Sequence, residues 1–230
     1  IHLATLDLAA LELGKDLPAH EILWKLREVL FHDQLRTPLF DSVYMMIWQE
    51  DHPGQEMKMP KTQSQDWLDI GLNTLAGATN SSGILTFARK LWEKGRDRTS
   101  RKRIQNILGG RSPLDWNRRE RLENLPKLLW ADITQAFEAN PILRIALCID
   151  EYEQIQLTKP RELSADGCIQ ELLGGLFFDP ATLDRFAVVV MGREKLRWDM
   201  VYDPEWKGLI ESHILNGLSE NDTLFFLTEK

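Results

Sequence analysis

The sequence has no run of about 18 consecutive apolar residues, the length that a helix needs to cross a bilayer. It also shows no leader of the kind that directs secretion. Only two cysteines occur, Cys148 and Cys168, and neither belongs to a CxxC pair or to a zinc-binding spacing. Because disulfides are rare in a reducing cytosol, this usage predicts a cytoplasmic protein without a membrane segment.

Common catalytic patterns are missing as well. The histidines are scattered without an HExxH pattern, so we expect no zinc hydrolase site; they are His2, His20, His32, His52 and His213. Ser81 and Ser82 lie in a turn that lacks the GxSxG pattern of a serine nucleophile. Cys148 falls in an apolar run, where a cysteine is more often a small hydrophobic residue than a nucleophile.

The composition that remains is that of an ordinary globular protein. Hydrophobic residues make up 43% and charged residues 27% of the chain, so a buried core is expected and disorder is not. The length of 230 residues predicts one or two domains. The net charge of -7 argues against a dedicated nucleic-acid-binding protein, because phosphate binding depends on clustered Lys and Arg.

One basic stretch, Lys94–Arg121, departs from this acidic balance. Its basic residues are Lys94, Arg96, Arg98, Arg101, Lys102, Arg103, Arg111, Arg118, Arg119 and Arg121. A solvated helix face is the interpretation that we favour. Binding of nucleic acid, of phosphates or of a partner protein stays open as an alternative, since Trp92 and Trp116 flank the stretch and aromatic rings can stack on bases.

The spacing of apolar residues predicts strands that alternate with helices. Strands are expected at Ile1–Leu8, Ile142–Ile149, Phe186–Met191 and, more weakly, His213–Leu215. Helices are expected from Pro18, from Phe40, within Trp67–Trp92, over Arg119–Ala139, through Leu172–Phe177 and from Ser219. Such alternation predicts an α/β fold with a mainly parallel sheet.

Charged residues follow two of the expected strands directly. Asp150 and Glu151 end the strand that starts at Ile142, and Arg193 follows the strand that starts at Phe186. Because the chemistry of parallel sheets gathers at the carboxyl ends of the strands, these side chains are expected to converge. A charged residue at the end of one strand is explained more simply by emergence of the chain into solvent. Charged residues at the ends of two strands of the same sheet together favour a functional site.

An apolar strand that ends in Asp-Glu is the Walker B pattern of nucleotide-binding proteins. Asp150 could hold the magnesium ion of a nucleoside triphosphate through a water molecule, since Mg²⁺ prefers oxygen ligands and keeps several waters. Glu151 could polarise the attacking water. Arg193, on the neighbouring strand end, could stabilise charge on the terminal phosphate. These are the candidate catalytic, cofactor-binding and metal residues.

Four segments resemble a known family. ALCIDEYEQI (146–155) is similar to a Walker B segment with matching Asp150, Tyr152 and Glu153, and FAVVVMGREKLRW (186–198) is similar to the next strand, with Gly-Arg and then Trp198. LFDSVYMMIWQEDHPG (39–54) resembles a preceding helix, with matches at Phe40, Asp41, Tyr44, Trp48 and Pro53, and ILNGLSENDTLFFL (214–227) resembles the step into lid helices. The family is that of the bacterial signal-transduction ATPases with numerous domains (STAND), P-loop NTPases related to NACHT and NB-ARC proteins.

The resemblance implies a fold and a function. It implies a three-layer α/β/α P-loop NTPase domain over residues 1–218, with a helical insertion over residues 40–140, and the start of a helical lid over residues 219–230. It implies a switch domain of a multidomain signalling or defence protein, in which binding and slow hydrolysis of ATP with Mg²⁺ control assembly. Self-association or partner proteins would then act through other domains of the full chain.

The phosphate-binding loop itself is missing. No GxxxxGK[ST] pattern occurs, and Gly14-Lys15 is followed by Asp16. The family order predicts this loop upstream of Ile1, and its strand between the Arg193 strand and the His213 strand. ATPase activity is therefore expected only when the upstream loop is present. The alternative function is a non-catalytic interaction scaffold with a degenerate nucleotide site.

Overall fold

The structure, a computed structural model, describes residues 1–9, 18–30, 35, 37–53, 55, 111, 115–156, 164–196, 198, 206 and 210–214. The chain divides into two compact units, Ile1–Glu194 and Lys195–Lys230. In the second unit Trp198 and Trp206 are buried, and their ring centroids lie 5.2 Å apart. The elements below all belong to the first unit.

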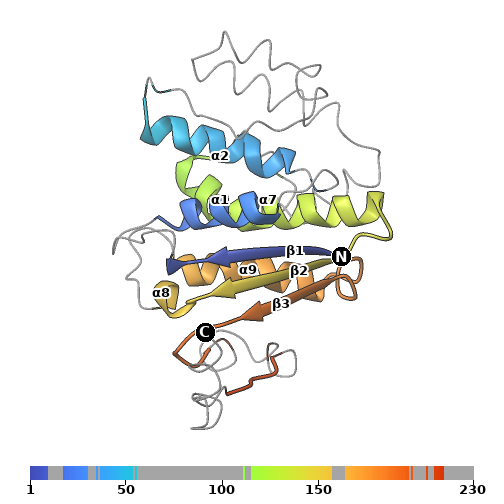
Figure 1. The fold of residues 1–230 in the computed structure, drawn as a ribbon. Helices are drawn as coiled ribbons and strands as arrows, with labels where there is room; N and C mark the ends of the chain where they lie inside the picture. The colour runs from blue at the N-terminus through green and yellow to red at the C-terminus, as the bar shows by residue number, and fades with distance from the viewer. Residues whose placement is uncertain are drawn as a thin grey trace, which may run out of the picture. The chain divides into compact units, whose positions relative to one another are not determined.

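Among the described residues, the core of the first unit is a parallel sheet of three strands (Figure 1). The strands are β1 (His2–Asp7), β2 (Ile145–Asp150) and β3 (Phe186–Val190), in the order β1-β2-β3. The expected α/β class and the parallel direction are therefore confirmed. β2 begins at Ile145 rather than at Ile142, because Pro141 and Ile142 form a turn that is closed by a hydrogen bond from the Leu143 N–H to the Asn140 carbonyl.

The predicted helices within the described residues are confirmed. They are α1 (Ala19–Leu30), α2 (Pro38–Asp51), α7 (Arg118–Ala139) and α9 (Ala165–Phe178). Asn117 and Glu120 begin α7 with a reciprocal capping box, in which each side chain accepts a hydrogen bond from the other residue's backbone N–H. Ser164 begins α9 in a similar way by accepting from the Gly167 N–H.

Two expectations differ from the structure, and three others fall outside the described residues. The short helix α8 (Glu153–Gln156) lies where a polar loop was expected. His213 and Ile214 form no strand, although one was expected at His213–Leu215. The helices predicted within Trp67–Trp92 and from Ser219, and the boundary between residues 218 and 219, lie outside the described residues. Among the helices that the structure does describe, none combines the length and the apolar character required to traverse a bilayer.

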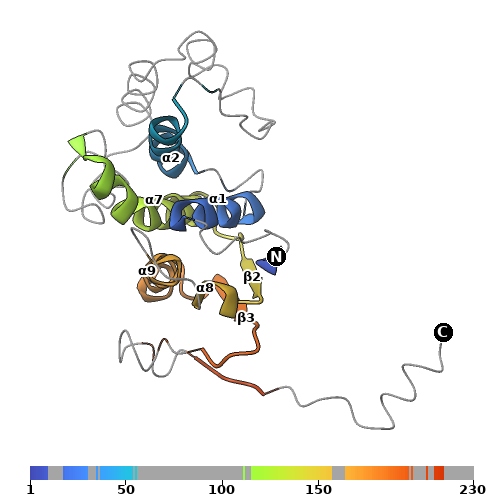
Figure 2. The same cartoon turned by 90° about the vertical axis from the view of Figure 1, so that its left-hand side faces the viewer.

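One face of the sheet is covered by helices. Alternate residues of each strand point to this face and are buried; they include Ala4, Leu6, Ile145, Leu147, Ile149 and Phe186. α1 contacts both β1 and α9, and α7 packs on α9. In Figure 2, α7 and α9 lie on one side of the strands, and α1 lies next to β1. α2 packs on α7 and forms the outer part of the same side.

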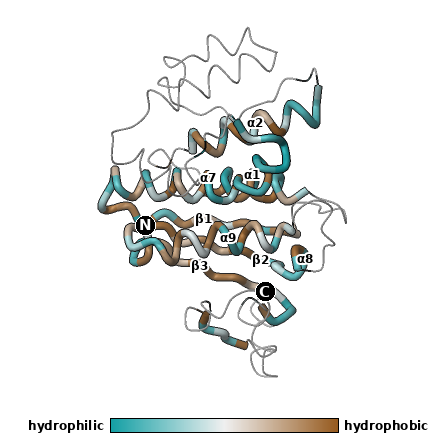
Figure 3. The backbone as a smooth tube through the Cα atoms, turned by 180° about the vertical axis from the view of Figure 1, so that it is seen from behind, coloured by the Kyte–Doolittle hydropathy of each residue, from teal (hydrophilic) through white to brown (hydrophobic). Residues whose placement is uncertain are grey.

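The residues between these positions point to the opposite face, which the described helices leave open. Leu3 is 65% exposed and Val189 is 53% exposed, although both are apolar. In Figure 3, β3 is a hydrophobic segment that gives way to hydrophilic residues beyond its carboxyl end. The second helical layer of the expected α/β/α arrangement therefore remains a prediction.

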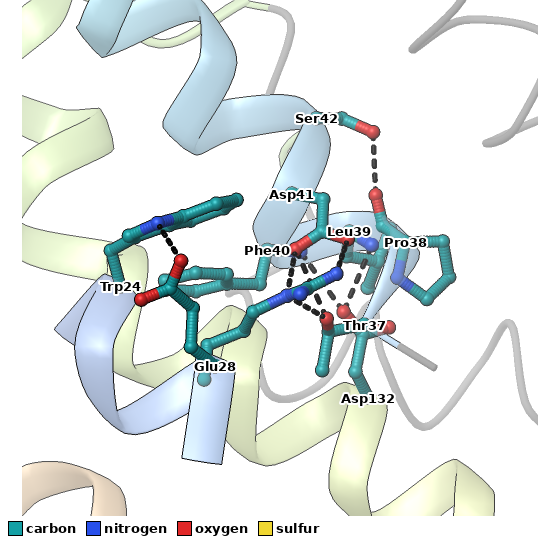
Figure 4. Close-up of polar contacts among 10 residues, drawn as sticks. Trp24, Glu28, Thr37, Pro38, Leu39, Phe40, Asp41, Ser42 and Asp132 are labelled. Atoms are coloured by element: carbon teal, nitrogen blue, oxygen red, sulfur yellow. Dashed lines mark hydrogen bonds and ion pairs between the residues drawn. The ribbon is translucent and has the colours of Figure 1, made fainter. Parts of the chain in front are cut away.

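A buried polar cluster joins α1, α2 and α7 (Figure 4). Arg27 donates to both carboxylate oxygens of Asp41, at 2.8 and 2.6 Å, and to the Thr37 hydroxyl at 3.0 Å. The Asp132 carboxylate on α7 accepts from the backbone N–H groups of Leu39 and Phe40, each at 2.9 Å. These donors belong to the first turn of α2, where N–H groups lack partners within the helix, so Asp132 fixes α7 to the start of α2.

Candidate functional site

The structure brings all three sequence-predicted site residues to one edge of the sheet. Asp150 is the last residue of β2, Glu151 follows it, and Arg193 lies just beyond β3. Strand pairing continues past β3, since Met191 donates to the Ile149 carbonyl at 2.8 Å and accepts from the Tyr152 N–H at 3.0 Å. This continued pairing holds the two chain segments together where they leave the sheet.

A further carboxylate joins this edge from β1. Asp7 is the register partner of Asp150, so both side chains leave the sheet on its open face at the same level. The Asp7 carboxylate accepts from the Ala9 N–H at 2.9 Å, and that of Asp150 accepts from the Glu151 N–H at 2.8 Å. Sequence reasoning missed Asp7, although it ends an apolar strand just as Asp150 does.

Glu151 has an unusual backbone conformation. Its φ angle of 52° lies in the left-handed region, which costs a residue with a side chain about 1–3 kcal/mol. This conformation turns the chain directly from β2 into α8, and the Glu151 carbonyl accepts from the Gln154 N–H at 3.0 Å. Such strain is typical of functional sites, where the surrounding structure holds it in place.

Tyr152 anchors this turn to the helical layer. Its side chain is buried, and its hydroxyl donates to the Asp166 carboxylate on α9 at 2.6 Å. The other oxygen of Asp166 accepts from the Gln170 side chain at 2.9 Å. A buried hydroxyl and carboxylate need such partners. Tyr152 therefore has a structural role, because it ties the strained turn to α9.

Arg193 lies between two carboxylates. Its guanidinium is 3.6 Å from the Glu151 carboxylate and 3.7 Å from the Glu153 carboxylate. The second oxygen of Glu153 accepts from the Arg193 backbone N–H at 3.1 Å. The Arg193 side chain is 83% exposed, so it can move, whereas its backbone is held.

In the part of the chain that the structure describes, this edge carries carboxylate oxygens beside the Arg193 guanidinium. Within the described residues, no group of three or more His, Cys, Asp or Glu side chains is arranged to hold a metal ion directly. Asp7 and Asp150 supply carboxylate oxygens that suit Mg²⁺, which in nucleotide sites takes its other ligands from water and from phosphate oxygens. Arg193 supplies the charge that an anionic ligand would need.

The described arginines of the basic stretch are paired with acids instead of lying free. Arg111 contacts Glu120 at 2.6 Å, and Arg119 contacts Glu123 at 2.7 Å. Arg118 and Arg121 contact Asp51 and Glu50 at the end of α2. The exposed Arg119 supports the interpretation of a solvated helix face, whereas the Arg121 side chain is only 13% exposed and lies against the end of α2. Residues 94–110 lie outside the described residues.

Comparisons with protein-family models, with curated proteins and with solved structures find no match to this chain.

Proposed function

We propose that this chain is the part of a nucleotide-driven switch that holds the magnesium ion and reads the terminal phosphate of ATP. One observation carries the proposal: Asp150, Glu151 and Arg193 converge at the carboxyl edge of a parallel sheet. In such sheets ligands bind beyond the strand ends. The strained φ angle of Glu151 adds support, because the fold maintains it at a cost.

Each residue has a role that its position allows. Asp150, with Asp7 beside it, would hold the magnesium ion, which would offset the negative charge of the phosphates. Glu151 polarises the water that attacks the terminal phosphate. Arg193, with its exposed guanidinium, pairs with that phosphate and so distinguishes ATP from ADP. Hydrolysis or exchange then releases this contact and resets the switch.

The phosphate-binding loop would come from the chain upstream of Ile1. Among the described strands β3 pairs only with β2, so its outer edge is available for a further strand. That edge is where the resemblance places the strand of the phosphate-binding loop, next to the Arg193 strand. The loop would supply backbone N–H groups and a lysine to the phosphates.

The test is nucleotide binding by the full-length protein, with bound nucleotide identified by chromatography after denaturation. We expect Asp150→Ala to weaken binding of Mg-ATP about 10–100-fold, the effect typical of losing an outer-shell metal partner, with little change when Mg²⁺ is chelated. We expect Glu151→Gln to retain ATP but to stop its turnover. Glu194→Gln removes an exposed charge from the same edge and serves as the control.

A second function is an interaction scaffold with a degenerate nucleotide site. It is favoured by the missing GxxxxGK[ST] pattern and by the open apolar face that carries Leu3 and Val189. A full-length protein that contains no nucleotide and ignores added Mg-ATP would exclude the switch and support the scaffold.

A further inference from the structure

Glu153 is the most buried carboxylate at this edge of the sheet, yet the proposed chemistry does not use it. Its side chain is 7% exposed, compared with 29% for Glu151. Removing a carboxylate from water is costly unless hydrogen bonds and a cation compensate. The partners of Glu153 should therefore indicate why the fold maintains it.

Those partners lie on the loop that follows β3. One Glu153 oxygen accepts from the Arg193 backbone N–H at 3.1 Å, and the other lies 3.7 Å from the Arg193 Nε. Glu153 thus contacts both the backbone N–H and the side chain of Arg193, which is 40 positions away in the sequence. Because the Arg193 side chain is long and largely exposed, it would otherwise sample many rotamers.

Gly192 makes this approach possible. A Cβ atom at this position would lie 2.6 Å from a Glu153 carboxylate oxygen. The nearest backbone atoms, the nitrogens of Tyr152 and Glu153, would be 3.5 Å from it. A methyl group would therefore push the carboxylate aside without a backbone clash. The glycine before Arg193 is needed for the space it leaves to Glu153.

We propose that Glu153 is a positioning residue for Arg193. Its buried carboxylate holds the Arg193 backbone as a pivot and keeps the guanidinium beside Glu151, at the place where the terminal phosphate would lie. When a terminal phosphate arrives, the guanidinium transfers to it from the two carboxylates, and Glu151 is released to act on water. An exposed ion pair such as Arg193–Glu151 is weak enough for this exchange. The inference rests on the proposed function, since it gives Arg193 a phosphate to read.

The experiment measures the ratio of ADP to ATP dissociation constants in the full-length protein with Mg²⁺. We expect Glu153→Ala and Gly192→Ala each to reduce the preference for ATP about tenfold, as for the loss of a hydrogen bond to a charged group. Glu153→Gln, which keeps an acceptor for the Arg193 N–H, should restore part of it. Glu194→Gln should leave the ratio unchanged. Arg193→Ala combined with Glu153→Ala should lose no more than Arg193→Ala alone, because the two residues act as a unit.

Backbone hydrogen exchange at Arg193 tests the pivot without nucleotide. It should be faster in Glu153→Ala than in Glu194→Gln, and equal rates would overturn the inference even if the protein bound no ATP. If Arg193→Ala abolishes the preference for ATP while Glu153→Ala and Gly192→Ala retain it, the positioning role is wrong and the proposed function stands. A wild-type protein that binds neither nucleotide overturns the proposed function. Gly192→Ala covers the case in which Glu153→Ala does not fold, since it meets only the end of a flexible side chain.

Discussion

The buried pair Arg27–Asp41 makes the sharpest prediction about stability. Both side chains are 2% exposed, and the guanidinium donates to both carboxylate oxygens. Replacing Arg27 by Met would leave the Asp41 carboxylate buried without its cation. Breaking a buried pair from one side costs about 3–5 kcal/mol. For a chain of this length each kcal/mol lowers the melting temperature by about 2–4 °C, so we expect Arg27→Met to melt about 6–20 °C lower.

The assay is thermal and urea unfolding of three variants. Arg119→Met is the matched control, because Arg119 pairs with Glu123 at 2.7 Å but is 87% exposed, and its loss should leave the melting temperature unchanged. The double variant Arg27→Met with Asp41→Leu should recover most of the loss, since no charge is then left buried. If Arg27→Met melts within error of Arg119→Met, the reasoning from burial is refuted.

The same variant should respond to pH in a defined direction. Burial raises the pKa of the Asp41 carboxyl, and Arg27 and the Thr37 hydroxyl oppose this rise. Without Arg27 the folded-state pKa rises further above the unfolded value, so folding takes up a proton. The loss of unfolding free energy in Arg27→Met, relative to wild type, should be smallest below the unfolded-state pKa of Asp41. It should grow as pH increases through the folded-state pKa. A deficit independent of pH would show that Asp41 is not the group left unpaired.

Two further predictions concern α9. Gly175→Ala should destabilise the protein by about 1–3 kcal/mol despite the better helix propensity of alanine, because a Cβ would lie 2.5 Å from Cε3 of the Trp130 ring. Gly167→Ala is the control: its Cβ would meet only Ser164, at 3.5 Å, so this variant should be neutral or stabilising in the same urea titration. Burial raises the pKa of the Cys168 thiol to about 12, so at pH 8 iodoacetamide should modify Cys168, detected by mass spectrometry, only after urea unfolds the chain; prompt modification of the folded protein would contradict this burial.

Sequence reasoning predicted the elements whose signal is local. Apolar runs indicated β1, β2 and β3, and apolar residues at helical spacing indicated α1, α7 and α9, because these periods record which face is buried. The convergence of Asp150 and Arg193 followed from the parallel direction of the strands. α8 has four residues, too few for a periodic pattern to identify it.

What the sequence did not predict depends on pairing between distant segments. Asp7 joins the candidate site only because the register places it opposite Asp150. Asp41 matched the family resemblance, but nothing local indicated that Arg27, one helix earlier, would bind it. Glu153 follows Glu151 by two residues, yet it is buried under Gly192 while Glu151 remains partly exposed. Such differences arise from tertiary packing and not from residue type.

Substitutions in the buried cluster and in the candidate site should therefore have separate effects on stability and on nucleotide preference. Arg27 and Asp41 join α1 to α2, whereas the strained turn at Glu151 is tied to α9 through Tyr152 and Asp166. Arg27→Met should lower the melting temperature but leave the ADP-to-ATP ratio of dissociation constants unchanged at temperatures where the protein is folded. Glu153→Ala should change this ratio even at temperatures where the variant is fully folded, so its loss of stability does not explain the change. If Arg27→Met altered the ratio as strongly as Glu153→Ala, nucleotide preference would reflect global stability, and Arg193 would have no specific positioning.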